Sequence, residues 1–194
     1  EINLDREDLV SDYYFSVIFL STVTQDADVS QSQVPGGIGT NVILSVGNKG
    51  AASGEIKEFS IPRFLSSGPV PITILLQNNS KHYIVPTGRV IIQDMLGRQV
   101  GLINILPQYI LSNSARFMID SDQASPSAEL EDQTARLAID HGVLIWPGKF
   151  LFGIYTAYAH VKLSENGPVF ETKTSFIALP IYILFAISFI AFVL

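Results

Sequence analysis

The chain of 194 residues contains no cysteine. This absence excludes a disulfide framework, and also zinc and iron–sulfur sites that are ligated by cysteine. Basic residues are few, with 12 lysines and arginines against 18 acidic residues and a net charge of −6. Because this balance cannot neutralise a row of phosphates, the sequence argues against nucleic acid as a partner.

The sequence patterns of common catalytic sites are missing as well. No two of the three histidines, His82, His141 and His160, stand at the metal-ligating spacings i, i+2 or i, i+4. The glycine-rich residues 36–39 are not followed by the Gly-Lys-Ser/Thr of a phosphate-binding loop, and no nucleophile elbow occurs. A Ser–His–Asp triad is assembled in space, so that alternative stays open. We expect a protein that is not an enzyme and needs no cofactor.

Hydrophobic residues, by contrast, make up 47% of the chain, and the excess lies at its C-terminal end. Residues 176–194 read FIALPIYILFAISFIAFVL and carry no charge. About 20 apolar residues span a bilayer as a helix, and this stretch lacks the polar face of a helix at a protein surface. The sequence therefore predicts a transmembrane helix over 176–194; a hydrophobic strand pair or a terminal core helix are the alternatives. The expected lipid anchors are Phe176, Pro180, Tyr182, Phe185, Phe189 and Phe192.

A single C-terminal membrane helix places the preceding residues outside the cytoplasm and the C-terminus inside it. No signal-peptide pattern occurs at Glu1, so we expect an export signal that has been removed or lies upstream. We also expect a short basic cytoplasmic tail beyond Leu194.

The remaining sequence is typical of β-strands. Residues 70–76 alternate strictly, with Val70, Ile72, Ile74 and Leu76 on one face, which is the period of a half-buried strand. Leu96-Gly97 and Asn166-Gly167 predict hairpin turns. Seven short strands fit into residues 51–175 and predict a β-sandwich. Two further strands are predicted at 13–23 and 41–47, with a glycine-rich turn or bulge at 35–40. We expect residues 1–50 to be the last strands of a preceding, truncated sandwich domain.

Several segments resemble a known family. They are "NNSKHYIVPTGRVIIQDMLGRQV", "ILSNSARF", "GIYTAYAHVKL" and a last strand that runs directly into the apolar segment. This layout is similar to that of the WxL-interacting proteins, which are membrane-anchored, immunoglobulin-like (Ig-like) surface proteins of Gram-positive-type bacteria. The resemblance covers most of residues 10–194 and implies two Ig-like domains followed by one transmembrane helix. The acidic residues 120–140 depart from it, because this connection is short in the family.

The tyrosine at the start of the long strand predicts a feature of Ig-like sandwiches. In such domains a tyrosine at this place hydrogen-bonds to nearby backbone, and a disulfide cysteine follows two residues later. Here the two positions are Tyr155 and Ala157, which suits a core without cysteine. Trp146 is expected in the preceding turn, where it would cover the end of the sandwich.

Two loops are candidate contact surfaces. "NNSKHY", residues 78–83, is predicted to connect two core strands and to present Lys81, His82 and Tyr83 at an exposed tip. Within it, Asn78-Asn79-Ser80 is also an N-glycosylation sequon. The acidic residues 120–140 form a long loop of the kind that often carries function.

In the acidic loop the candidate contacts are Glu129, Glu131 and Asp132. A solvated loop or a Ca²⁺ site are the alternatives there.

The sequence thus predicts an all-β protein with an Ig-like β-sandwich, followed by one C-terminal transmembrane helix. Its expected function is non-enzymatic. The sandwich would be presented at the cell surface to a protein or cell-wall partner, and membrane lipid would be contacted through 176–194. The alternative function is that of an accessory or assembly subunit in a larger membrane complex.

Overall fold

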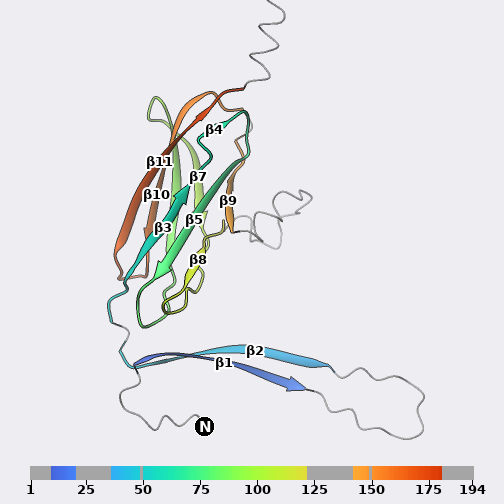
Figure 1. The fold of residues 1–194 in the computed structure, drawn as a ribbon, viewed down its shortest axis with the longest axis vertical. Helices are drawn as coiled ribbons and strands as arrows, with labels where there is room; N and C mark the ends of the chain where they lie inside the picture. Colours follow the sequence, from blue (N-terminus) through green and yellow to red (C-terminus); the bar gives the residue numbers. More distant parts are fainter. Residues whose placement is uncertain (1–9, 21–35, 49, 122–141, 149, 181–194) are drawn as a thin grey trace, which may run out of the picture. The chain divides into compact units, whose positions relative to one another are not determined.

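The chain divides into two compact units, Glu1–Lys49 and Gly50–Leu194. The computed structural model describes residues 10–20, 36–48, 50–121, 142–148 and 150–180. Within these ranges the regular structure is all β-strand, which confirms the predicted class (Figure 1). None of the described residues belongs to a helix of the length and hydropathy needed to cross a membrane.

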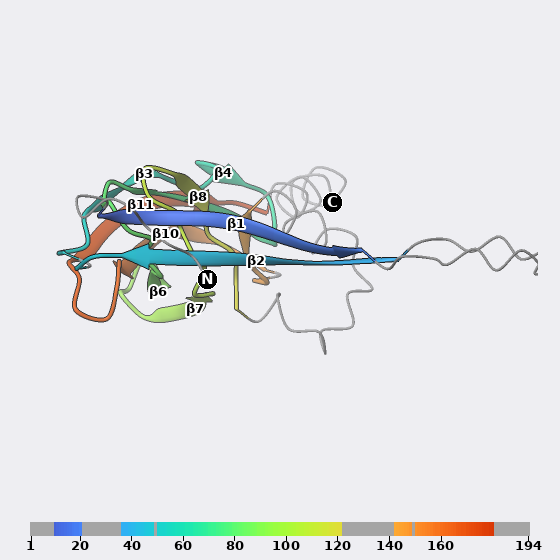
Figure 2. The ribbon, with the colours of Figure 1, turned by 90° about the horizontal axis from the view of Figure 1, so that it is seen from below.

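The first unit contains two antiparallel strands, β1 (Ser11–Leu20) and β2 (Gly37–Val46), which lie side by side (Figures 1 and 2). The prediction of two strands is confirmed. The predicted turn or bulge at 35–40 is wrong from Gly37 onward, because these residues already pair with β1 in a register that does not shift. Gly37 lies opposite Leu20, and a Cβ at Gly37 would stand 3.1 Å from the leucine side chain. Glycine here leaves room for a large neighbour in the opposite strand.

The second unit is a sandwich of two sheets. The first sheet consists of β3 (Gly54–Ser60), β5 (Val70–Asn78) and β8 (Ala115–Phe117), with β9 (Val143–Trp146) also paired to β5. The second sheet has the order β4 (Phe64–Leu65), β11 (Val169–Ala178), β10 (Gly153–Lys162), β6 (Thr87–Asp94) and β7 (Gln99–Ile105). This all-β arrangement is consistent with an Ig-like sandwich.

The core lies between the inner faces of the two sheets. On β5 the four predicted residues Val70, Ile72, Ile74 and Leu76 are fully buried, which confirms the alternation. On β10 the inward residues after Tyr155 are small or aliphatic, at Ala157, Ala159 and Val161, and they alternate with outward residues that are mostly polar. Burial of each large aliphatic side chain contributes about 1.5–3 kcal/mol, so the alternating residues of these two strands stabilise the sandwich.

One strand of the first sheet is interrupted. β8 pairs with the end of β5 at Leu75, and β9 pairs with the start of β5 from Thr73. Between them the Met118 N–H donates to the carbonyl of Ile74 at 2.9 Å, so the two short strands follow one line along β5. The chain leaves this line after Met118 and returns at Val143, which makes the acidic segment an insertion within a strand.

The departing chain crosses to the other sheet. Asp120 forms a bridge with Ile105 at the end of β7, and the Ser121 N–H donates to the carbonyl of Asn104 at 3.0 Å. Among the described strands β7 is an outermost strand of its sheet, and this pairing covers one end of its outer edge. Residues 122–141 lie outside the described residues.

The last strand extends past the predicted boundary after Ser175. β11 continues to Ala178, and Phe176 is buried in the core with its ring stacked on Tyr155 at 5.3 Å. The assignment of Phe176 to a membrane anchor is therefore wrong, because an unbroken apolar run does not mark where a core strand ends. Pro180 follows the strand and is half-buried. The other anchors, Tyr182, Phe185, Phe189 and Phe192, lie outside the described residues.

The tyrosine interaction predicted at the start of β10 is confirmed. The Tyr155 hydroxyl accepts a hydrogen bond from the Phe152 N–H at 3.1 Å and donates to the Phe152 carbonyl at 3.4 Å. Trp146, expected in a turn, instead ends β9 and is buried, with its ring 5.9 Å from that of Tyr155 in a T-shaped contact. The two aromatic rings therefore join both sheets at this end of the core.

Replacing Tyr155 by phenylalanine keeps the ring but removes both hydrogen bonds to Phe152. We expect the free energy of unfolding to fall by about 1–2 kcal/mol, the usual cost of a lost, partly buried hydrogen bond. Urea denaturation of the full chain in detergent measures it, because the single tryptophan, Trp146, reports on the sandwich. Tyr158→Phe, on the opposite face of β10, is the matched control and should leave the midpoint unchanged. Equal shifts in both variants would contradict a special role for Tyr155.

Candidate binding surfaces

The predicted contact loop is a connection between the two sheets. β5 ends at Asn78 in the first sheet, and β6 begins at Thr87 in the second. The prediction that residues 78–83 connect two core strands is confirmed. Because the connection crosses the end of the sandwich, its backbone polar groups need partners outside the strand ladders.

The Asn78 side chain supplies two of these partners and also binds a second loop. Its side chain is fully buried, and its amide nitrogen donates to the carbonyl of His82 at 2.8 Å. The same nitrogen donates to the carbonyls of Ile110 and Leu111, each at 3.0 Å. Its oxygen accepts from the Ser80 N–H at 2.8 Å. The amide nitrogen has two hydrogens for three carbonyls, so one N–H is shared between two acceptors. Through these bonds the Asn78 side chain connects its own loop to the loop that contains Ile110 and Leu111.

Serine side chains tie a third segment to this connection. The Ser80 hydroxyl accepts from the Ser53 N–H at 2.8 Å and donates to the Ser53 carbonyl at 3.0 Å. The Ser112 hydroxyl donates to the Ser80 carbonyl at 2.7 Å. The surface at this end is therefore held in one conformation, which lowers the entropy that a partner must offset on binding.

The exposure of the three predicted contacts differs from expectation. Lys81 is exposed and Tyr83 is half-buried, but His82 is buried at 6% exposure, so it does not lie at an exposed tip. Tyr83 packs edge-on against Tyr109 at 5.2 Å, and Tyr109 is 53% exposed. Tyr109 was missed because no local pattern signals which distant aromatic residue meets Tyr83. Asn78, the sequon residue, keeps its amide inside the fold, so that amide is unavailable for glycosylation in the folded state.

The second predicted surface, the acidic loop, falls mostly on residues that are not described. Glu129, Glu131 and Asp132 lie outside the described residues. Asp120 is buried beside the end of β7. Among the described residues, no three or more histidine or acidic side chains gather in a way that could hold a metal ion.

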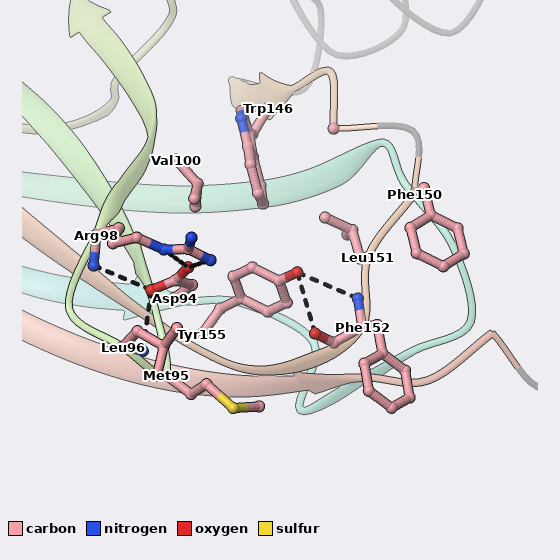
Figure 3. A pocket seen from close by; sticks show the side chains of 11 residues that line it. Asp94, Met95, Leu96, Arg98, Val100, Trp146, Phe150, Leu151, Phe152 and Tyr155 are labelled. Atoms are coloured by element: carbon pink, nitrogen blue, oxygen red, sulfur yellow. Dashed lines mark hydrogen bonds and ion pairs between the residues drawn. The ribbon is translucent and has the colours of Figure 1, made fainter.

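At the opposite end of the sandwich lies a cleft that sequence reasoning missed. It encloses about 450 Å³ and is formed by the β6–β7 turn and the segment between β9 and β10 (Figure 3). Its lining residues are mostly apolar and aromatic; they include Met95, Leu96, Trp146, Phe150, Phe152 and Tyr155. The residues come from segments about fifty positions apart, so no spacing in the sequence indicates the cleft.

An ion pair lies at the rim of this cleft. The Asp94 carboxylate accepts from the backbone N–H groups of Leu96 and Arg98, at 2.9 and 3.0 Å, and pairs with the Arg98 guanidinium at 2.7 Å. The hydrogen bond from the Arg98 side chain is the main cause that lowers the pKa of Asp94 below its usual value. At a pH above the usual aspartate pKa, the ion pair therefore contributes its full stabilisation of the turn. This contribution is lost as the pH falls through the lowered pKa of Asp94. It closes the β6–β7 hairpin predicted at Leu96-Gly97.

Comparison with known proteins adds no assignment to either surface. No protein-family model matches the chain, and no curated protein sequence matches it. What the two ends of the sandwich can do is therefore argued from their own residues: one end is polar and rigid, and the other is apolar and aromatic.

Proposed function

We propose that the chain is a non-enzymatic module that holds an Ig-like sandwich at the outer surface of a membrane and presents it to a protein or cell-wall partner. The observation that carries this proposal is the direct passage from β11 into uncharged, apolar sequence. β11 ends at Ala178 inside the sandwich, and no charged residue follows from Leu179 to Leu194. This stretch approaches the roughly 17–25 residues that span a bilayer core as a helix.

Three features support the Ig-like assignment. The order of strands places β10 between β6 and β11, with short β4 parallel to the end of β11. Tyr155 makes the backbone hydrogen bonds expected at the start of this strand in Ig-like domains. Ala157 is fully buried where such domains often carry a cysteine, in keeping with a sandwich that needs no disulfide.

The connection at 78–83 is the surface best suited to a partner. It is rigid, and it presents Lys81 and the Tyr83–Tyr109 pair at the end opposite the apolar segment. Strand addition at a sheet edge is a second mode of peptide binding. The edge strand β3 is poorly suited to it, because the register shifts between Ile56 and Glu58 and charged residues line the strand.

The alternative function, a subunit of a larger membrane complex, draws support from the first unit. Apolar side chains on β1 and β2 are exposed, including Ile18, Phe19, Leu20 and Ile38. Two-stranded sheets are marginally stable alone, so such a surface suits burial against other protein. Size measurement in mild detergent separates the functions: a monomer supports the first, and a defined complex supports the second.

Membrane anchoring is tested by removing the apolar segment. We expect the full chain to remain with membranes through an alkaline carbonate wash and to need detergent for release. A variant that ends at Pro180 should appear in the soluble fraction with unchanged tryptophan fluorescence, because Trp146 and the strands of the sandwich remain. A full chain that is recovered in the carbonate supernatant would overturn the anchor.

A further inference from the structure

Exposed apolar side chains gather at the end of the sandwich from which the C-terminal segment departs. Their exposure ranges from 51% for Ile154 to 72% for Phe64. The set is Phe64, Met95, Leu96, Phe150, Phe152 and Ile154. Isolated exposed apolar residues are normal, whereas a cluster at one place marks a surface that contacts something apolar.

The strand register shows that these residues share one end. Ile177, near the end of β11, is the partner of Phe64 on β4 and of Ile154 on β10. Tyr155 is opposite Asp94, where β6 ends and the turn with Met95 and Leu96 begins. Phe150 and Phe152 line the same cleft as that turn (Figure 3). The cluster therefore surrounds the last residues of β11.

The opposite end of the sandwich has a different character. Its connections expose Asn79, Lys81, Asn113, Glu165 and Asn166. Apolar side chains are exposed there too, at Tyr109, Leu111 and Val169, but polar and charged residues lie between them. The apolar cluster is thus a property of one end, and that end is the one at which β11 finishes, next in the sequence to the apolar segment.

The chain offers no spacer between the cluster and that segment. Leu179 and Pro180 are the described residues beyond β11, and a residue spans at most about 3.6 Å. If Ile181 lies at the membrane surface, as the proposed anchor requires, Ala178 is held within about 11 Å of it. The sandwich cannot stand away from the bilayer on such a short tether.

We propose that this end of the sandwich lies in the lipid–water interface, with Leu96, Phe150 and Phe152 inserted among the headgroups. The proposal rests on the proposed membrane anchor and specifies how the ectodomain is oriented on it. Apolar side chains at an interface enter about 5–10 Å into the headgroup and acyl boundary. The aromatic rings suit this depth, where one side is apolar and the other is wet.

The charges at this end favour an anionic lipid surface. Arg63 is exposed beside Phe64, and Arg98 lies at the rim of the cleft, where its guanidinium pairs with the Asp94 carboxylate. The chain as a whole has a net charge of −6. The three charged side chains Arg63, Asp94 and Arg98 sum to one positive charge, so lipid phosphates can lie beside Arg63 although the chain as a whole is acidic.

Depth measurement in vesicles tests the orientation, and the absence of native cysteine makes single labels straightforward. The full chain is reconstituted into vesicles of phosphatidylcholine and phosphatidylglycerol, with a fluorescent label at Leu96→Cys or Phe152→Cys. Lys81→Cys and Glu165→Cys, exposed at the opposite end, are the matched controls. We expect nitroxide-labelled lipid to quench the labels at 96 and 152 several-fold more than the controls, and aqueous iodide to quench the controls more.

Each other outcome has a definite meaning. Labels at 96 and 152 that iodide reaches as readily as the controls, on chains that float with the vesicles, would overturn the inference and leave the anchor intact. Labels that neither quencher reaches would show that protein, such as a second copy, covers this end, and would also overturn it. Chains that fail to float with the vesicles would refute the anchor and the inference together.

A charge variant provides a second measurement. Leu96→Asp combined with Phe150→Asp changes two exposed side chains, so the sandwich should keep its fold and its Trp146 fluorescence. We expect a label at residue 152 in this variant to become accessible to iodide while the chain still floats with the vesicles. A label that stays buried in lipid would contradict the role of these two side chains.

Discussion

Replacing Asn78 by alanine should destabilise the sandwich more than any change at an exposed loop residue. The change removes the donor for three carbonyls, those of His82, Ile110 and Leu111, and the acceptor for the Ser80 N–H. An unpaired buried polar group costs about 1–3 kcal/mol, and the costs are not additive once the loops relax, so we expect a loss of about 3–5 kcal/mol. Urea denaturation followed by Trp146 fluorescence measures the free energy of unfolding.

The neighbouring asparagine is the matched control. Asn79 has an exposed side chain, and its backbone N–H donates to the Ser53 carbonyl at 2.9 Å, which alanine preserves. Asn79→Ala should therefore change the stability by less than about 0.5 kcal/mol. Asn78→Asp should be as damaging as alanine, because a carboxylate has no donor for the three carbonyls. A loss under about 1 kcal/mol for Asn78→Ala would show that water replaces the amide.

Truncating Phe176 should have an effect of similar size, for a different reason. Its side chain is 1% exposed and its ring is stacked on Tyr155. Removing a buried aromatic side chain leaves a cavity and costs about 3–5 kcal/mol. We expect Phe176→Ala to lower the urea midpoint of the full chain in detergent by a corresponding amount.

Phe64→Ala is the control for Phe176. Phe64 pairs through its backbone with Ile177, next to Phe176 in the sequence, but its side chain is 72% exposed. Its truncation should leave the free energy of unfolding unchanged within about 0.5 kcal/mol. If Phe176→Ala instead weakened membrane retention and left the sandwich as stable as before, the residue would belong to the anchor and not to the core.

The predictable parts of this fold are those whose signals are local. The strict alternation of residues 70–76 depends on one strand alone, and so do the turns at Gly97, which has a φ of 75°, and at Asn166-Gly167. The hydrogen bonds of Tyr155 were predicted from the tyrosine that Ig-like domains carry at this place, and their partner, Phe152, lies only three residues away.

The missed features depend on contacts between distant residues. β9 is stabilised by β5, and its four residues are too few to show a period on their own. His82 is buried although it lies in a polar connection, and the segments around residues 53 and 110 that are bonded to this connection are distant in the sequence. The end of β11 was misplaced because Phe176 and Ala178 have the same apolar character whether they face a core or lipid. The aromatic cleft was missed because its walls meet in space and not in sequence.

The interruption between β8 and β9 is a site at which the sandwich can tolerate insertions and deletions. Met118 and Val143 are held on adjacent positions of β5, so the two ends of the insertion are already close together. Each doubling of such a loop costs about 0.6 kcal/mol in closure entropy, little against the burial along β5. The chain can therefore change in length between Ser121 and Gly142, even by a guest domain, while β5 keeps both of its short partners and β7 keeps its contacts with Asp120 and Ser121.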